Sequence, residues 1–134
     1  MKNLLKRIKE NEGFSEDVYK CSLGYDTIGY GFAIKDLHLD EDICDMILER
    51  KLADLKLIVN QKIPFISDLP EAVQEVLYEM YYQMGNSLWN FKKTIQFLRL
   101  GDFEAASVEM LDSKWSRQTP NRSKRLSQIV KYAK

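Results

Sequence analysis

Three side chains that can move protons or hold water stand near the start of the chain, at Glu12, Cys21 and Thr27. A carboxyl group can donate a proton to a leaving oxygen, and a thiol and a hydroxyl can share one water molecule. A proton donor on one side of a bond and a held water on the other is the minimum for glycoside hydrolysis. Each residue alone is more often structural, so the chemistry depends on whether the fold brings them together.

The elements around these residues follow from the local pattern. Asn3 can cap a first helix, and Gly13 can end it, so Glu12 falls in the last turn. The partial negative charge at a helix C-terminus disfavours another negative charge and therefore favours a protonated acid there. From residue 18 to 34, Tyr, Thr, Ile and Phe alternate with Gly, which predicts short antiparallel strands with Cys21 directly opposite Thr27.

The pattern of the rest of the chain predicts helices. Asp40 is expected to cap a long helix that ends before Pro64, and Asp68 with Glu71 resembles a capping box that starts the next helix. Further helices are expected over residues 91–100, from about residue 102, and after a turn at residues 119–121. The predicted fold class is α+β and predominantly α, in one domain of 134 residues.

The charge of the chain is balanced overall but uneven along its length. Lys plus Arg and Asp plus Glu both total 20, so net charge selects no partner. No acidic residue follows Asp112, whereas the same segment carries seven basic residues: Lys114, Arg117, Arg122, Lys124, Arg125, Lys131 and Lys134. This segment is either a solvated helix face or a surface that attracts anionic polymers, such as nucleic acid or bacterial envelope polymers.

The sequence gives little support for a disulfide-rich, metal-binding or membrane-spanning protein. Two cysteines, Cys21 and Cys44, form no disulfide framework or metal spacing, and we interpret Cys44 as structural. The single His38 removes most zinc and Ser-His-Asp schemes, so no metal and no cofactor are expected. No apolar run is long enough to span a membrane, and the charged N-terminus does not resemble a signal peptide. Synthesis in a cytoplasm is therefore expected.

The chain resembles the phage T-even-type lysozymes, glycoside hydrolase family 24, from end to end. Their signature is Glu, eight residues, Asp or Cys, five residues, Thr, which is met here by Glu12, Cys21 and Thr27. The flanking segments "NEGF", "VYKC" and "GYDTIGYG" agree with the family. Downstream, "YYQMG", "FEAA" and "SKWSRQTPNRSKR" look like the corresponding helices and turn.

This resemblance implies a two-lobed lysozyme-like fold. A sheet lobe with the connecting helix would cover about residues 13–58, and a helical lobe would comprise residues 59–134 with the first helix, residues 3–12. It also implies an endolysin that cleaves the β-1,4 bond between N-acetylmuramic acid and N-acetylglucosamine in peptidoglycan, with inversion. Such an enzyme acts on the glycan strand as a monomer, without nucleic acid or membrane insertion. It reaches the wall after holin-type export and lyses the bacteriophage's host.

The resemblance also assigns roles to residues. Glu12 would protonate the leaving oxygen, while Cys21 and Thr27 would position or activate the water. Arg122 would orient the Glu12 carboxylate. Residues at four further positions fall where the family contacts sugar, although Ala33 is shorter and Glu109 adds a charge compared with the family pattern: these are Ala33, Tyr82, Thr94 and Glu109.

Three alternatives remain open from the sequence. A cysteine peptidase would pair Cys21 with His38. A basic helical module would bind nucleic acid or another partner through the C-terminal segment. A non-catalytic relative would bind peptidoglycan without cleaving it. Whether Cys21 acts as a thiol or as a thiolate also remains open, and activity should rise with pH only in the second case.

Overall fold

The computed structural model describes residues 1–134 and divides into two compact units, Met1–Asp45 and Met46–Lys134. Seven α-helices and one small antiparallel sheet near the N-terminus confirm the predicted α+β, predominantly α class. The predicted lobe boundaries, including the assignment of the first helix to the helical lobe, stay a prediction.

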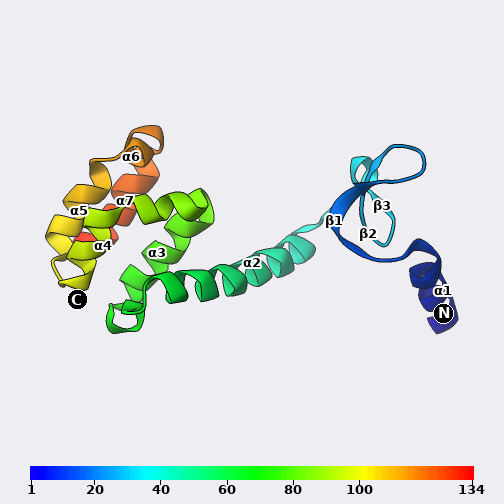
Figure 1. The fold of residues 1–134 in the computed structure, drawn as a ribbon, viewed down its shortest axis with the longest axis horizontal. Coiled ribbons are helices and arrows are strands. Elements are labelled where there is room, and N and C mark those ends of the chain that lie inside the picture. The colour runs from blue at the N-terminus through cyan, green and yellow to red at the C-terminus, as the bar shows by residue number, and fades with distance from the viewer. The chain divides into compact units, whose positions relative to one another are not determined.

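The first unit contains the sheet (Figure 1). Helix α1 (Lys2–Glu12) is followed by the strands β1 (Ser15–Lys20), β2 (Asp26–Gly29) and β3 (Phe32–Ala33) and by a short 3-10 turn (Ile34–Asp36). The strands are antiparallel in the order β1-β2-β3.

Helix α1 ends where the sequence predicted and begins earlier than predicted. Gly13 adopts φ 71°, and its N–H donates to the Lys9 carbonyl over 2.9 Å, so Gly13 ends the helix and Glu12 is its last residue. The predicted Asn3 cap is wrong. The helix already starts at Lys2, and the Met1 carbonyl accepts a bond from the Leu5 N–H, so Asn3 lies inside the first turn.

The pairing of β1 with β2 is shifted from the predicted pairing, which placed Cys21 directly opposite Thr27. Thr27 pairs with Tyr19, and Asp26 pairs with Lys20, so Cys21 is not the direct partner of Thr27. The Cys21 carbonyl instead accepts a bond from the Gly24 N–H over 2.8 Å. The Cys21 N–H donates to the Tyr25 carbonyl over 3.0 Å, so the loop consists of residues 22–24, with Gly24 at φ 85°, and lies one residue earlier than expected, which moves the register.

Helix α2 (Glu41–Lys62) begins in the first unit and continues into the second. The Asp40 carboxylate accepts a hydrogen bond from the Ile43 N–H over 3.0 Å, which confirms the predicted cap. The helix ends before Pro64, as expected, because proline would remove a backbone donor and clash with the preceding turn.

The second unit is entirely helical after α2. Its elements are a 3-10 turn (Ile66–Asp68), α3 (Glu71–Met84), a second 3-10 segment (Gly85–Asn90), α4 (Lys92–Arg99), α5 (Phe103–Leu111), α6 (Lys114–Gln118) and α7 (Pro120–Lys131). The predicted capping box of α3 is wrong, because Pro70 occupies the cap position and no side chain caps the helix. The expected start of a helix at about residue 102 is confirmed, and the Asp102 carboxylate caps α5 by accepting a bond from the Ala105 N–H.

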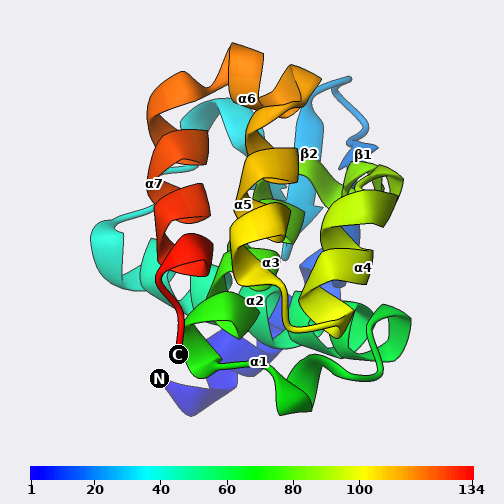
Figure 2. The same cartoon turned by 90° about the vertical axis from the view of Figure 1, so that its left-hand side faces the viewer.

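The helices of the second unit enclose one apolar core. Figure 2 shows α5 beside α7, and α7 also packs against α3. Leu77 and Met80 from α3, Met110 from α5 and Leu126 and Val130 from α7 are almost fully buried in it. Burying a side chain of this size contributes about 1.5–3 kcal/mol each, so this core holds the helices that line the pocket described below.

Candidate functional site

One carbonyl oxygen ties Cys21 and Thr27 together. The Tyr25 carbonyl accepts a hydrogen bond from the Cys21 backbone N–H over 3.0 Å and another from the Thr27 hydroxyl over 2.9 Å. Thr27 is buried, with 2% of its surface exposed, whereas Cys21 is half-buried and therefore reachable from solvent. The two signature residues are thus neighbours, although they are not directly opposed in the sheet.

The surroundings of Cys21 favour its ionised form. Hydrogen bonding to the backbone of Tyr25 and then of Leu23 lowers the pKa of the Cys21 thiol, and burial acts in the opposite direction. The Thr27 side chain and the Gly24 backbone lower this pKa further. Thr27 has a smaller effect on this pKa than the backbone of Tyr25 or Leu23.

Glu12 lies against the turn between β2 and β3. Its carboxyl group occupies the space beside the Cα of Gly31, where a Cβ atom would come within 2.9 Å of the Glu12 Cδ and still closer to Oε2. Lys9, one turn earlier on α1, places its Nζ 5.3 Å from the Tyr30 ring centroid. The end of α1 therefore meets this turn through two neighbouring contacts, and only glycine leaves room for the acid.

Ala33 and His38 are two further residues of the first unit that the sequence analysis singled out. Ala33 pairs with Thr27 across β2 and β3, so it adjoins the Cys21–Thr27 pair within the sheet. His38 is exposed and makes no hydrogen bond or ion pair, so nothing couples it to Cys21 as a cysteine peptidase would require.

Arg122 lies in the second unit and forms an ion pair there. Its Nε donates to the Glu79 carboxylate over 2.9 Å, with both side chains more than a third exposed. An exposed pair of this kind contributes at most about 1 kcal/mol to stability. Glu12 and Arg122 belong to different units, and their predicted contact stays a prediction.

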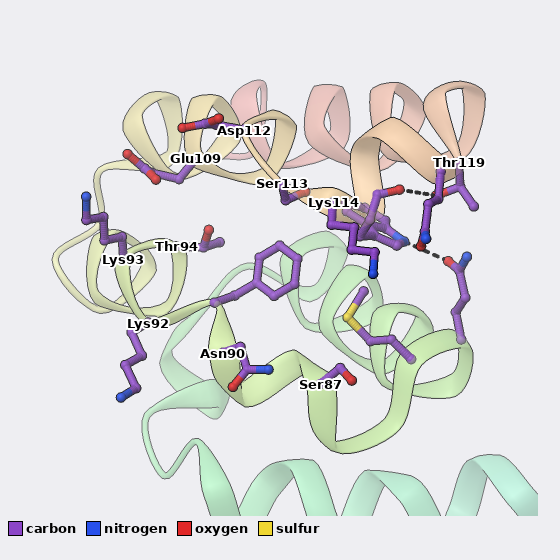
Figure 3. Close-up of a pocket in the computed structure, with 15 residues that line it drawn as sticks. Ser87, Asn90, Lys92, Lys93, Thr94, Glu109, Asp112, Ser113, Lys114 and Thr119 are labelled. Carbon is purple, nitrogen blue, oxygen red and sulfur yellow. Dashed lines mark hydrogen bonds between the residues drawn. The ribbon is translucent and has the colours of Figure 1, made fainter.

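The second unit carries a pocket of about 730 Å³ between α4, α5, α6 and the segment after α3 (Figure 3). Phe91 and Trp115 meet edge to face in it, with ring centroids 6.0 Å apart. The indole N–H of Trp115 donates to the Gln83 side chain over 2.9 Å, which fixes the ring. A rigid aromatic wall with polar groups around it is typical of a ligand site.

Two of the predicted sugar-contacting residues, Thr94 and Glu109, line this pocket together. Thr94 is buried, with 3% of its surface exposed, and its side chain points into the pocket in Figure 3. Glu109 is half-buried on the facing helix α5. A third, Tyr82, lies elsewhere in the same unit, exposed in a shallow recess with Tyr81 and the α2 residues Lys51 and Asp54.

Two classes of feature are absent. No three His, Cys, Asp or Glu side chains gather closely enough to hold a metal ion. None of the helices combines the length and the apolar character that crossing a membrane requires.

Several residues of the pocket were not predicted from the sequence. Gln83 and Trp115 lie in the segments "YYQMG" and "SKWSRQTPNRSKR", which carried the family resemblance without being given roles. Asp112 and Lys114 also line the pocket. The signal available was that Ser113 can cap a helix: its hydroxyl accepts a bond from the Ser116 N–H, and this cap places Lys114 and Trp115 at the start of α6.

Comparison with known proteins supports the resemblance to the phage lysozymes. The family model described as phage lysozyme matches residues 9–131. The chain is 25% identical to "Probable T4-type lysozyme 1" of Dictyostelium discoideum, over 92% of this chain and 90% of that protein. It is 26% identical to "Probable T4-type lysozyme 2" of the same organism, over 95% of this chain and 92% of that protein.

Proposed function

Because the chain belongs to the phage lysozyme family, we propose that it is a glycoside hydrolase that cleaves the β-1,4 bond between N-acetylmuramic acid and N-acetylglucosamine in peptidoglycan, with inversion. Glu12, Cys21 and Thr27 carry the reaction in this proposal. The substrate is the glycan strand, and the reaction needs only water as its second reactant.

The chemistry follows the general scheme for inverting glycosidases. Glu12 gives its proton to the glycosidic oxygen as the bond to the anomeric carbon breaks. A water molecule held by Cys21 and Thr27 attacks that carbon from the opposite face and passes a proton to the Cys21 thiolate. The lowered pKa of Cys21 supports the thiolate as the proton acceptor.

The observation that carries this proposal is the shared Tyr25 carbonyl. It accepts bonds from the backbone of Cys21 and from the hydroxyl of Thr27, so the two groups that would attend the water have one anchor. A non-catalytic peptidoglycan-binding relative would have no need for a half-exposed thiol held beside a buried hydroxyl. Preorganised groups of this kind contribute to catalysis because they need not reorient during the reaction.

The products distinguish this reaction from cleavage of the other glycan bond and from hydrolysis with retention of configuration. Digestion of purified peptidoglycan should release fragments whose new reducing end is N-acetylmuramic acid, as mass spectrometry after borohydride reduction would identify. Proton NMR during the first minutes should show the α-anomer at that end, because inversion of a β-bond gives α. Reducing ends on N-acetylglucosamine would contradict the bond assignment, and an initial β-anomer would contradict inversion.

We further propose that the chain acts as a monomer on the wall outside the cytoplasm in which it is made. Its origin in a bacteriophage and a role in host lysis remain predictions from the family resemblance.

A further inference from the structure

The outward face of α7 carries large apolar side chains that the protein leaves exposed. Ser123, Leu126 and Val130 are buried, so the residues on the opposite side of the helix face outward. Among the exposed residues, Ile129 has 39% of its surface accessible, and Tyr132, which follows the last turn, has 70%. Burial of these two side chains against another surface would be favourable.

The neighbouring helix α5, which packs beside α7 (Figure 2), adds two more exposed apolar side chains. Val108 is 62% exposed and Leu111 is 44% exposed, and the exposed acids Glu104 and Asp112 lie at the two ends of this helix. A single exposed apolar residue is ordinary, but a group of them marks an interaction surface. We call the four side chains the apolar patch of α5 and α7: Val108, Leu111, Ile129 and Tyr132.

The charges of α7 are all positive. Lys124, Arg125 and Lys131 are exposed on this helix, and no acidic residue follows Asp112 in the chain. None of these three cations forms an ion pair within the protein. The Lys131 Nζ lies 5.4 Å from the centroid of the Tyr132 ring, so a cation and an exposed aromatic ring are direct neighbours.

Exposed cations beside exposed apolar side chains favour an anionic lipid surface as the partner. At such a surface, lysine and arginine meet the headgroup phosphates, while aliphatic and aromatic side chains enter the boundary with the acyl chains. A nucleic acid would engage the same cations through its phosphates but would leave the aliphatic members of the apolar patch in water. Lipid therefore accounts for both features of the face, and a nucleic acid accounts for only one.

We propose that the outward face of α7, together with the apolar patch, binds the surface of a membrane that contains anionic phospholipid. The helix lies along the surface, with Lys124 and Arg125 at headgroup phosphates and Ile129 and Tyr132 below them. This attachment is peripheral and reversible. It uses none of the residues of the proposed reaction, so the inference does not depend on the proposed function.

The test mixes the whole chain with vesicles of phosphatidylcholine alone or of phosphatidylcholine with phosphatidylglycerol, and measures the protein that sediments with them. The parent should bind the mixed vesicles at least roughly ten-fold more tightly, and added salt should reduce the difference. Lys124→Gln with Arg125→Gln should weaken binding to mixed vesicles roughly 10- to 30-fold, because each cation near an anionic membrane adds to the attraction.

Ile129→Ser with Tyr132→Ser tests the apolar part of the face. This variant keeps every charge, and it should weaken binding to mixed vesicles at least roughly five-fold, because less apolar surface is buried. Its binding to a short DNA duplex should match that of the parent, whether weak or strong. Both positions are exposed, so the thermal midpoint should stay close to that of the parent, and unfolding would not explain the loss.

Arg50→Gln with Lys51→Gln is the matched control, because it removes one arginine and one lysine from adjacent exposed positions on α2 in the same unit. This variant should bind mixed vesicles as the parent does. Equal binding of the parent to the two kinds of vesicle, or binding to neither, would overturn the inference.

Two further outcomes would also overturn it. If the Ile129→Ser, Tyr132→Ser protein binds mixed vesicles as the parent does, while the Lys124→Gln, Arg125→Gln protein loses vesicles and DNA alike, the face is a general site for polyanions. If the control variant loses as much vesicle binding as the Lys124→Gln, Arg125→Gln protein, net charge explains the attraction and α7 has no special part in it.

Discussion

At the scale of single residues, the thiol at Cys21 is the feature with the clearest chemical consequence. Its pKa is lowered, first by hydrogen bonding to the Tyr25 backbone, so the thiolate is populated at a lower pH than in an unperturbed cysteine. With Cys44 replaced by Ser, the rate of iodoacetamide alkylation should rise with pH around a midpoint below the ordinary value of about 8.5. A midpoint at or above that value would contradict the assigned surroundings of the thiol.

Replacement of Cys21 by Asp tests what the thiolate does. An aspartate titrates near ~3.9, far below a thiol, so the base is present at lower pH in the variant. We expect Cys21→Asp to remain active and its rate–pH profile to extend to lower pH. An unchanged profile would show that Cys21 holds water without accepting its proton.

Gly31 tests the placement of the acid. Gly31→Ala should cost about 1–2 kcal/mol from the positive φ of 73°, and it should also displace the Glu12 carboxyl that fills the space beside Gly31. Gly101→Ala is the control, since Gly101 has φ 77° and nothing within 4 Å of an added Cβ. Urea unfolding should show similar losses, but only Gly31→Ala should lose activity. Equal activity in both would separate Glu12 from catalysis or from this turn.

At the scale of elements, the Asp40 side chain caps the start of α2. Asp40→Ala should destabilise the protein by about 1 kcal/mol, because the Ile43 N–H loses its acceptor. Asp40→Asn should keep most of that stability, since asparagine caps helices about as well. Thermal unfolding of the two variants distinguishes the cap from a general charge effect, and equal losses in both would contradict the cap.

The elements were largely predictable where a local signal decides them. Gly13 ends the first helix, Asp40 caps α2 and a further helix starts after residue 102, as the sequence indicated. The failures occurred where two local signals compete. Pro70 holds the cap position that Asp68 was expected to support, and the tight turn at Gly24 shifts the sheet register.

Less of the candidate site than of the helices could be predicted from the sequence. Cys21 and Thr27 are neighbours for a reason that spacing could not supply, because a shared backbone carbonyl joins them and direct cross-strand pairing does not. The charged pocket in the second unit depends on tertiary packing of α4 against α5 and α6. No periodicity in the sequence reveals that Thr94 and Asp112, eighteen positions apart, face one space.

At the scale of the whole molecule, the basic C-terminal segment offers a means of approach to an anionic envelope. Lys124 and Arg125 are exposed on α7, whose buried face is formed by Ser123, Leu126 and Val130. Reversing both charges to Glu should slow lysis of cells at low salt and reduce its salt dependence, since screening removes the attraction in the parent.

Lys6→Glu with Arg7→Glu provides the matched control for that experiment. This pair changes net charge by the same amount from an exposed position on α1. Turbidity of a cell suspension, followed across a salt series, should separate the C-terminal pair from the control. An equal effect of the two pairs would assign the salt dependence to net charge instead of the C-terminal segment.

In the proposed reaction the proton of Glu12 is needed to break the glycosidic bond, and the release of reducing ends from purified murein measures that step. The parent should release them steadily, and Glu12→Gln should be slower by at least about 100-fold, because general acid catalysis supplies that much or more. Sedimentation with murein should show that both proteins still bind. A parent that releases no reducing ends, or a Glu12→Gln protein that matches its rate, would exclude Glu12 as the general acid of a glycan hydrolase.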